Sequence, residues 1–379
     1  MEDRPHKRRA HYPGKYPKKY EEKYKELNPE KYGDTIEHVI EKGGTPAGMH
    51  ISIMVKEVLD ALQIQPGMQG CDCTLGYGGH TQAMLEKLCG KEETDIRRAV
   101  SADPQEFCLK TEMKQTDTKA APGSHLVSLD IDPIESVKTE MRLRDKGYGP
   151  DLLAIEHINF ADLDLAAEKY GKFDFLMADL GVSSMQIDNP ERGFSYKTEG
   201  PLDLRMNPEK GEPASERLKK LSEGELTGLL IDNSDEPYAE EIAKVISRRK
   251  WKKQAIETTT DLADAVAEAL HFLPEAERKN EVKKSCARVF QALRIDVNSE
   301  FESLESLMEK LPLVMKSGGR AAILTFHSGE DRIVKKAFKT YYKKKICREI
   351  SDDVTRPSKE ECYRNPRAKS TKLRWAVFS

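Results

Sequence analysis

The chain lacks any apolar run of the length needed to span a lipid bilayer. Its first residues also lack the apolar core of a signal peptide, and their Glu-rich character argues against an organelle transit peptide. Charged residues make up 34% of the 379 residues, but the formal net charge is only −3, so neither sign of charge is in strong excess. We therefore expect a soluble, cytoplasmic protein with no membrane partner. The length suits one large domain with a smaller one, or two medium domains.

The seven cysteines show no pairing pattern, because their number is odd and the sequence contains no C-x-x-C pair. This favours reduced thiols and argues against a structural zinc site. The stretch HINFADLDL does offer His157, Asp162 and Asp164. Such a scatter is typical of strand ends and helix caps, so we predict no metal site and regard a metal hydrolase as the least favoured function.

Residues 1–48 form a basic N-terminal extension, most of which interleaves Lys and Arg with Tyr and Pro. A segment of this composition buries little apolar area, so we predict that it is flexible. Basic residues beside aromatics suit a nucleic-acid-binding tail, with Lys and Arg on phosphates and Tyr stacked on bases. A solubilising tail is the equally favoured alternative.

Folded structure is expected to begin near His50, with an amphipathic helix in ISIMVKEVLDALQI. A short strand through CDC then runs into Gly76, Gly78 and Gly79, and a helix follows. The backbone N–H groups of such a turn and helix start can cradle an anionic or polar ligand. The spacing G-x-G-G differs from the G-x-G-x-x-G of dinucleotide enzymes, which weakens a nicotinamide interpretation.

Two further strands are predicted in HLVSL and LLAIE, each followed by a residue suited to a nucleoside. Asp130 ends the first run, where an acid accepts hydrogen bonds from ribose hydroxyls in nucleoside-binding α/β folds. Asp132 is the better candidate for a helix N-cap. Phe160 lies just beyond the second run, where an adenine ring could stack on it, although a core phenylalanine is equally compatible.

The segment Phe173–Met206 is predicted to hold the chemistry. A buried strand, FDFLMA, stops at Asp179, and GVSSMQIDNPERGFS follows without helical or strand periodicity. A carboxylate at the carboxyl end of a strand points at the ligand site of an open α/β sheet. Long loops of this kind are usually functional, with a surface loop capped by a turn aspartate as the alternative. The repeated strand–helix units predict a doubly wound α/β sheet with a nucleoside pocket.

Seven ordered motifs from about Met49 to the C-terminus carry a family resemblance: TLGYGGH, DLGVSSMQID, ERGFS, GPLDLRMN, RVFQALRIDVNSE, SGGRAAILTFHSGEDRIVK and NPRAKSTKLR. The chain resembles the S-adenosylmethionine-dependent cytosine-N4 methyltransferases of small-subunit ribosomal RNA, of the MraW or RsmH type. The resemblance implies a class I, Rossmann-like methyltransferase fold with an inserted, mainly helical domain. It also implies methyl transfer to the exocyclic amine of a cytosine in the decoding centre of 16S rRNA.

The resemblance assigns roles residue by residue. The Gly turn and His80 line the methionine end of the cofactor, Asp130 holds the ribose and Phe160 lies against the adenine. Asp179 and Gln186 complete the pocket. For catalysis we expect Asp179 and the following loop with Ser183 to act on the amine. Asp203 and Arg205, in PLDLRM, are second candidates for base or phosphate contact.

The expected organisation is a methyltransferase domain over 49–195 and 286–379, with a helical substrate-recognition domain inserted at 196–285. Arg248–Lys253, RRKWKK, gives the insert a basic face that could rest on RNA phosphates, although a solvated helix end is somewhat more favoured for any single lysine. The expected partner is small-subunit rRNA or the 30S particle. The oligomeric state stays open, and a homodimer is compatible.

Two rival functions stay open: a methyltransferase of the same fold acting on another RNA or DNA amine, and a ribosome-assembly protein that binds RNA without catalysis. Three departures from the family bear on this choice. Residues 91–123 form a longer insertion than usual, the N-terminal tail is an addition, and Gly329 stands where the family typically has Leu. Together they suggest a divergent branch whose target nucleotide could differ.

Overall fold

A computed structural model describes residues 52–91 and 120–379 of the chain. The predictions for the N-terminal extension, and nearly all of the expected insertion at 91–123, lie outside these residues. Within the two described ranges, no helix is both long and apolar enough to cross a membrane.

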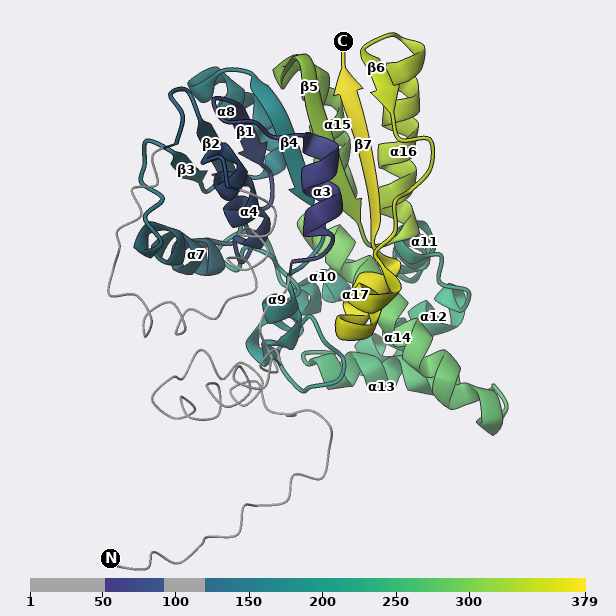
Figure 1. Cartoon of the computed structure of the whole chain (residues 1–379). Coiled ribbons are helices and arrows are strands. Elements are labelled where there is room, and N and C mark those ends of the chain that lie inside the picture. Colours follow the sequence, from purple (N-terminus) through teal and green to yellow (C-terminus); the bar gives the residue numbers. More distant parts are fainter. Residues whose placement is uncertain (1–51, 92–119) are drawn as a thin grey trace, which may run out of the picture. The chain divides into compact units, whose positions relative to one another are not determined.

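The centre of the fold is a seven-stranded sheet in the order β3-β2-β1-β4-β5-β7-β6 (Figure 1). Strands β1 to β5 run parallel to one another, whereas β7 is antiparallel to both β5 and β6. The strands are β1 Gln69–Asp72, β2 His125–Leu129, β3 Leu153–Glu156, β4 Phe173–Asp179, β5 Met315–Thr325, β6 Cys347–Ile350 and β7 Lys372–Phe378. The chain order β3-β2-β1-β4 reverses direction at β1, as in a doubly wound sheet.

Helices cover both faces of this sheet, and each face has its own hydrophobic core (Figure 1). Helices α3 Val55–Leu62, α4 Gly79–Leu88 and α7 Pro133–Asp145 supply one core. Helices α8 Leu163–Tyr170, α15 Glu300–Val314 and α16 Ser328–Lys343 supply the other. Successive residues of one strand point to opposite faces, so Phe175 and Leu176 fall into different cores. The predicted α/β sheet with helices on both faces is confirmed.

A third hydrophobic core belongs to a helical segment between β4 and β5 and gathers buried residues from Phe194 to Leu293. Its helices are α10 Ala214–Lys220, α11 Glu223–Ser234, α12 Ala239–Trp251, α13 Thr259–Ala269 and α14 Glu275–Asn298. Helix α14 continues unbroken past residue 285 and carries the chain back towards the sheet. The helical pattern predicted over this stretch is therefore present.

The stretch after Asp179 was predicted to be an irregular loop, but the structure shows helical turns there. It contains the short helix α9 Ser184–Asp188 and the 3₁₀ turn η3 Pro190–Arg192. A five-residue helix is too short to show hydrophobic periodicity, which explains the wrong prediction. The remaining short elements are η2 Phe160–Asp162, α17 Lys359–Arg364 and η4 Pro366–Ser370.

Candidate active site

Three strand-end carboxylates meet at one edge of the sheet, because β2 and β4 both pair with β1 in parallel. Asp72 ends β1, Asp130 follows β2 and Asp179 ends β4. The β1 loop joins them: Thr74 Oγ1 accepts a hydrogen bond from the Asp179 N–H at 2.7 Å, and the Thr74 N–H donates to Asp72 at 3.1 Å. The Gly76 N–H donates to Asp130 at 2.7 Å. The predicted convergence at this edge is thus present for Gly76, Asp130 and Asp179.

Asp130 is held by backbone donors alone. Its Oδ2 accepts from Gly76 N–H at 2.7 Å, and its Oδ1 accepts from Asp132 N–H at 2.8 Å. A carboxylate has about four lone-pair sites, so each oxygen keeps capacity for a hydroxyl donor. Burial raises the pKa of Asp130 to about 6, against the opposing effect of these two backbone hydrogen bonds.

The glycines form a close-packed turn at the start of α4. Gly78 caps the helix with φ +82°, in the left-handed region that favours glycine. A Cβ on Gly78 would lie 2.8 Å from Thr139 Cγ2, and one on Gly79 would lie 1.9 Å from Ser52 Oγ. Among residues 52–91 and 120–379, no side chain caps the α4 N-terminus, so its backbone N–H groups remain suited to a polar ligand.

His80 and Asp179 face one another beside this turn. His80 Nε2 lies 2.9 Å from the carbonyl oxygen of Ile53 and must donate to it, which leaves Nδ1 towards Asp179 Oδ2 at 3.5 Å. Within the part of the chain that the structure describes, the other carboxylate oxygen, Asp179 Oδ1, is buried without a hydrogen-bond partner. Burial raises the pKa of Asp179 to about 6, with Asp72 and Glu330 adding to the rise and His80 opposing it. An unsatisfied buried acceptor of this kind fits a ligand that brings a donor.

Gln186 and Ser183 are locked together at the start of α9. Ser183 Oγ accepts from the Gln186 N–H, and Gln186 Oε1 accepts from the Ser183 N–H, which together form a capping box. Gln186 Nε2 donates to Asp132 Oδ2 at 2.7 Å. Gln186 therefore supports the site through Asp132, two residues from the ribose candidate Asp130.

A buried ion pair between Asp132 and Arg192 was not predicted from the sequence. Asp132 caps α7, as expected, through the N–H groups of Ile134 and Glu135. Its Oδ2 also accepts from Arg192 Nη1 at 2.9 Å, and both side chains are less than a tenth exposed. Arg192 Nη2 donates onward to the carbonyl oxygens of residues 205 and 206.

The second pair of candidates, Asp203 and Arg205, bind each other. Arg205 Nε and Nη2 donate to the two carboxylate oxygens of Asp203 at 2.8 and 2.7 Å. Leu204 between them has φ +65°, and Asn298 of α14 holds this turn by donating to the Leu204 carbonyl at 2.8 Å. Asn298 Oδ1 also accepts from the Met206 N–H at 2.7 Å. The turn is therefore rigidly held from α14.

Phe160 begins the turn η2 after β3, is partly buried and packs against the core of its face. This placement agrees with the core interpretation and leaves part of the ring uncovered.

A further His and carboxylate cluster, Glu300, His327 and Glu330, lies at the carboxyl end of β5. Arg294 donates to both oxygens of Glu300 at 2.7 and 2.9 Å, and the Phe326 N–H donates to Glu330 at 2.7 Å. The Arg294 guanidinium neutralises the charge of Glu300, and backbone N–H groups satisfy the Glu330 carboxylate. We therefore interpret the cluster as a support for the β5–α16 turn, next to Asp179.

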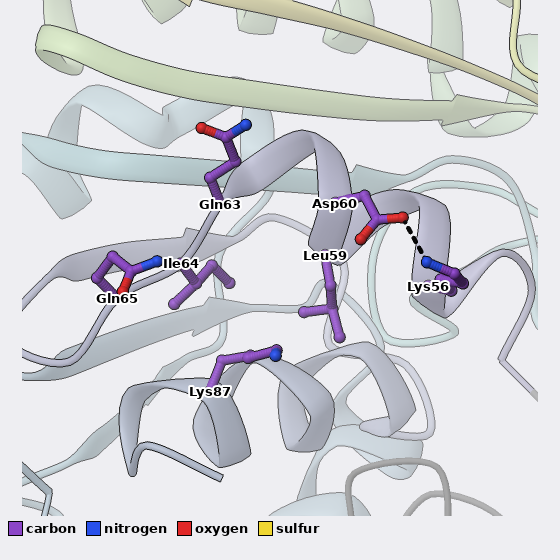
Figure 2. A pocket seen from close by; sticks show the side chains of 7 residues that line it. All are labelled: Lys56, Leu59, Asp60, Gln63, Ile64, Gln65 and Lys87. Carbon is purple, nitrogen blue, oxygen red and sulfur yellow. Dashed lines mark hydrogen bonds and ion pairs between the residues drawn. The ribbon is translucent and has the colours of Figure 1, made fainter. Parts of the chain in front are cut away.

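A cavity of about 350 Å³ lies elsewhere, at the ends of α3 and α4 (Figure 2). Its lining residues are Lys56, Leu59, Asp60, Gln63, Ile64, Gln65 and Lys87. These residues come from α3, from the segment that joins α3 to the start of β1 and from the last turn of α4, so the cavity is away from the carboxyl ends of the strands. Ligands of open α/β sheets bind at those carboxyl ends, and we place the candidate site there.

Comparisons with known proteins agree with the resemblance. The model of the MraW methylase family matches residues 47–117 and 114–379. The chain is 57% identical to "Ribosomal RNA small subunit methyltransferase H 1" of Agathobacter rectalis, over 99% of both chains. It is 49% identical to "Ribosomal RNA small subunit methyltransferase H 2" of Alkaliphilus metalliredigens, over 98% of this chain and 97% of that one. A solved rRNA methylase from Streptococcus thermophilus aligns over 86% of this chain and 93% of that one, with 10% identity and a TM-score of 0.33.

Proposed function

The chain belongs to the MraW methylase family and has a class I methyltransferase fold, and on that premise we propose that it methylates small-subunit ribosomal RNA. The specific reaction we propose is methyl transfer from S-adenosylmethionine to the exocyclic N4 amine of a cytosine in the decoding centre of 16S rRNA. The names of the similar proteins support small-subunit ribosomal RNA as the substrate class. The unsatisfied Asp179 Oδ1 at the strand-end edge is the observation that carries the catalytic assignment.

The residues at this edge fit S-adenosylmethionine, which supplies an electrophilic methyl group on a positively charged sulfur. At Gly78 and Gly79 a Cβ would lie against Thr139 and Ser52, so glycine lets the turn pack closely and fixes the N–H groups at the start of α4. Asp130 keeps free lone pairs for the two ribose hydroxyls. Asp130, Asp179 and the buried Asp72 give the edge a negative character that suits a cation.

Asp179 is the group we assign to the cytosine amine. The lone pair of that amine is delocalised into the ring, so the nitrogen is a poor nucleophile. A carboxylate that accepts one of its N–H bonds shifts electron density onto nitrogen and orients it. His80, whose Nε2 donates to the Ile53 carbonyl, lies with Nδ1 3.5 Å from the other carboxylate oxygen.

On the RNA side we propose that the helical segment 196–285 recognises the substrate. The Asp203–Arg205 turn of this segment is joined to Asp132 by Arg192, which donates to Asp132 and to the Arg205 carbonyl. The target cytosine has to be unpaired or taken out of its stack to reach Asp179.

The test compares Asp179→Asn with the parent in methyl transfer from labelled S-adenosylmethionine to 30S particles, naked 16S rRNA and DNA. We expect the variant to bind the cofactor and to lose at least about 100-fold in rate, as for the loss of a general acid–base group. A rate within a few-fold of the parent would remove Asp179 from the mechanism. Transfer by the parent to DNA alone, or failure to bind the cofactor in calorimetry, would overturn the proposed function itself.

A further inference from the structure

The carboxyl end of α12 presents a large aromatic ring within an unbroken basic run. The residues are Arg248, Arg249, Lys250, Trp251, Lys252 and Lys253. The Trp251 side chain is 83% exposed. Tryptophan is highly buried on average, so an exposed indole in a charged run is an unusual use of that residue.

The charges of this run are only partly compensated. Arg248 and Arg249 both pair with Glu268, and Lys250 Nζ donates to the Leu221 carbonyl at 2.8 Å. Within the described residues, the side chains of Lys252 and Lys253 have no hydrogen bond or ion pair. Glu268 thus compensates two of the five cations, and the two lysines that follow Trp251 are available to a partner.

The backbone after Trp251 is fixed rather than frayed. The Lys253 N–H donates to the Lys250 carbonyl at 3.0 Å, and the Gln254 N–H donates to the Arg249 carbonyl at 2.9 Å. These two bonds form a Schellman motif, with Lys253 in the left-handed position at φ +57°. Glycine is the residue favoured there, so the sequence keeps a lysine at a conformational cost.

The same run is connected to the candidate active site. The chain continues from Lys253 into an antiparallel bridge between Thr258 and Pro201, where the Leu202 N–H donates to the Glu257 carbonyl at 2.8 Å. Leu202 directly precedes Asp203, which begins the turn held by Arg205 and Asn298. The basic run and that turn therefore share one local support.

We propose that Trp251 is a stacking platform for an unpaired nucleotide of small-subunit rRNA, with Lys252 and Lys253 on the flanking phosphates. This inference rests on the proposed function and specifies where its substrate docks beyond the methylated base. An aromatic face beside unpaired lysines is the combination that single-stranded RNA recognises, because every base has a face to stack and every nucleotide carries a charge.

The experiment measures binding of a single-stranded 16S rRNA fragment, methyl transfer to 30S particles and cofactor affinity, for the parent and four variants. Trp251→Ala should weaken RNA binding about 5- to 150-fold, since stacking on one base is worth about 1–3 kcal/mol. Trp251→Phe should restore most of that loss. Phe272→Ala is the matched control, because Phe272 is 61% exposed and its ring lies against Tyr238 at the amino end of α12, the end opposite Trp251. Cofactor affinity should stay unchanged throughout.

Lys253→Gly separates binding from folding. Glycine relieves the left-handed backbone, so the melting temperature should rise or hold while RNA affinity falls and the salt slope of binding drops by about 0.7. RNA binding by Trp251→Ala within twofold of the parent would overturn the inference. So would a loss seen only with 30S particles and not with naked RNA, which would assign this face to a ribosomal protein. Methyl transfer by the parent tests the proposed function separately, and the binding assay decides the inference whatever that result.

Discussion

Replacing Arg192 by methionine should destabilise the protein more than any surface change of similar size. Arg192 is 7% exposed and Asp132 is 2% exposed, so their ion pair is shielded from water. The guanidinium also donates to the carbonyls of residues 205 and 206. Methionine fills much of the same volume but offers no donor, so the variant removes the charge and the hydrogen bonds together.

The size of the effect follows from what is left behind. Removing one partner of a buried ion pair costs about 3–5 kcal/mol, because the remaining charge is uncompensated. Asp132 keeps the Gln186 amide and two backbone N–H groups, which favours the lower end of that range. The two orphaned carbonyls add roughly 1 kcal/mol each where water cannot reach them. We therefore expect about 5 kcal/mol in total, a large share of the roughly 5–15 kcal/mol of a typical domain.

Urea denaturation of the full chain, followed by circular dichroism, measures this loss directly. Arg217→Met is the matched control, because Arg217 also binds a carboxylate, Asp296, but its side chain is 36% exposed. That control should cost less than about 1 kcal/mol. A double variant, Asp132→Asn with Arg192→Met, should recover part of the loss, since no buried charge then remains. Equal costs for the Arg192 and Arg217 variants would refute the account.

Three further predictions follow from the site. Because burial raises the pKa of Asp130 and Asp179 to about 6, the folded state binds these protons more tightly than the unfolded chain, and stability falls as pH rises from about 4 to 6. The free energy of unfolding of Asp179→Asn, measured by urea titration, should therefore increase relative to that of the parent as the pH rises across this range. A difference in stability that does not change with pH would contradict the pKa assignment. Gly78→Ala, with its left-handed φ and the contact with Thr139, should cost about 1–2 kcal/mol and weaken cofactor binding at least tenfold in calorimetry. Gly329→Leu restores the residue typical of the family, but its Cβ would lie 2.5 Å from the Phe301 ring, so melting should show a loss of about 1–3 kcal/mol that Phe301→Ala partly relieves.

Much of the sheet could be predicted from the sequence, because its parallel strands are short apolar runs that end in a carboxylate or a glycine turn. The rule that parallel strands present their carboxyl ends at one edge was enough to bring Gly76, Asp130 and Asp179 together. Strand β6, Cys347–Ile350, was not predicted. Two of its four residues are exposed charged side chains, so it has no apolar run to recognise.

The supports of the site were harder to predict, because they depend on pairs far apart in the sequence. Arg192 lies 60 residues from Asp132, and Asn298 lies 94 residues from Leu204. No local periodicity links such residues, so the fold alone brings them together. The capping box of Ser183 and Gln186 did have a local signal, S-x-x-Q, which could have identified helix α9.

Asp130 and Asp132 lie two residues apart at the end of β2 and have different roles. Asp130 accepts a hydrogen bond from the Gly turn and keeps lone pairs for a ligand, whereas the Asp132 carboxylate accepts hydrogen bonds from Gln186 and Arg192. The Asp132 N–H donates to Asp130, so the two carboxylates are positioned by one stretch of backbone. Arg192 extends that support to the turn at Asp203. The proposed cofactor side and RNA side thus share one support, which runs from Asp130 through Asp132 and Arg192 to the turn at Asp203.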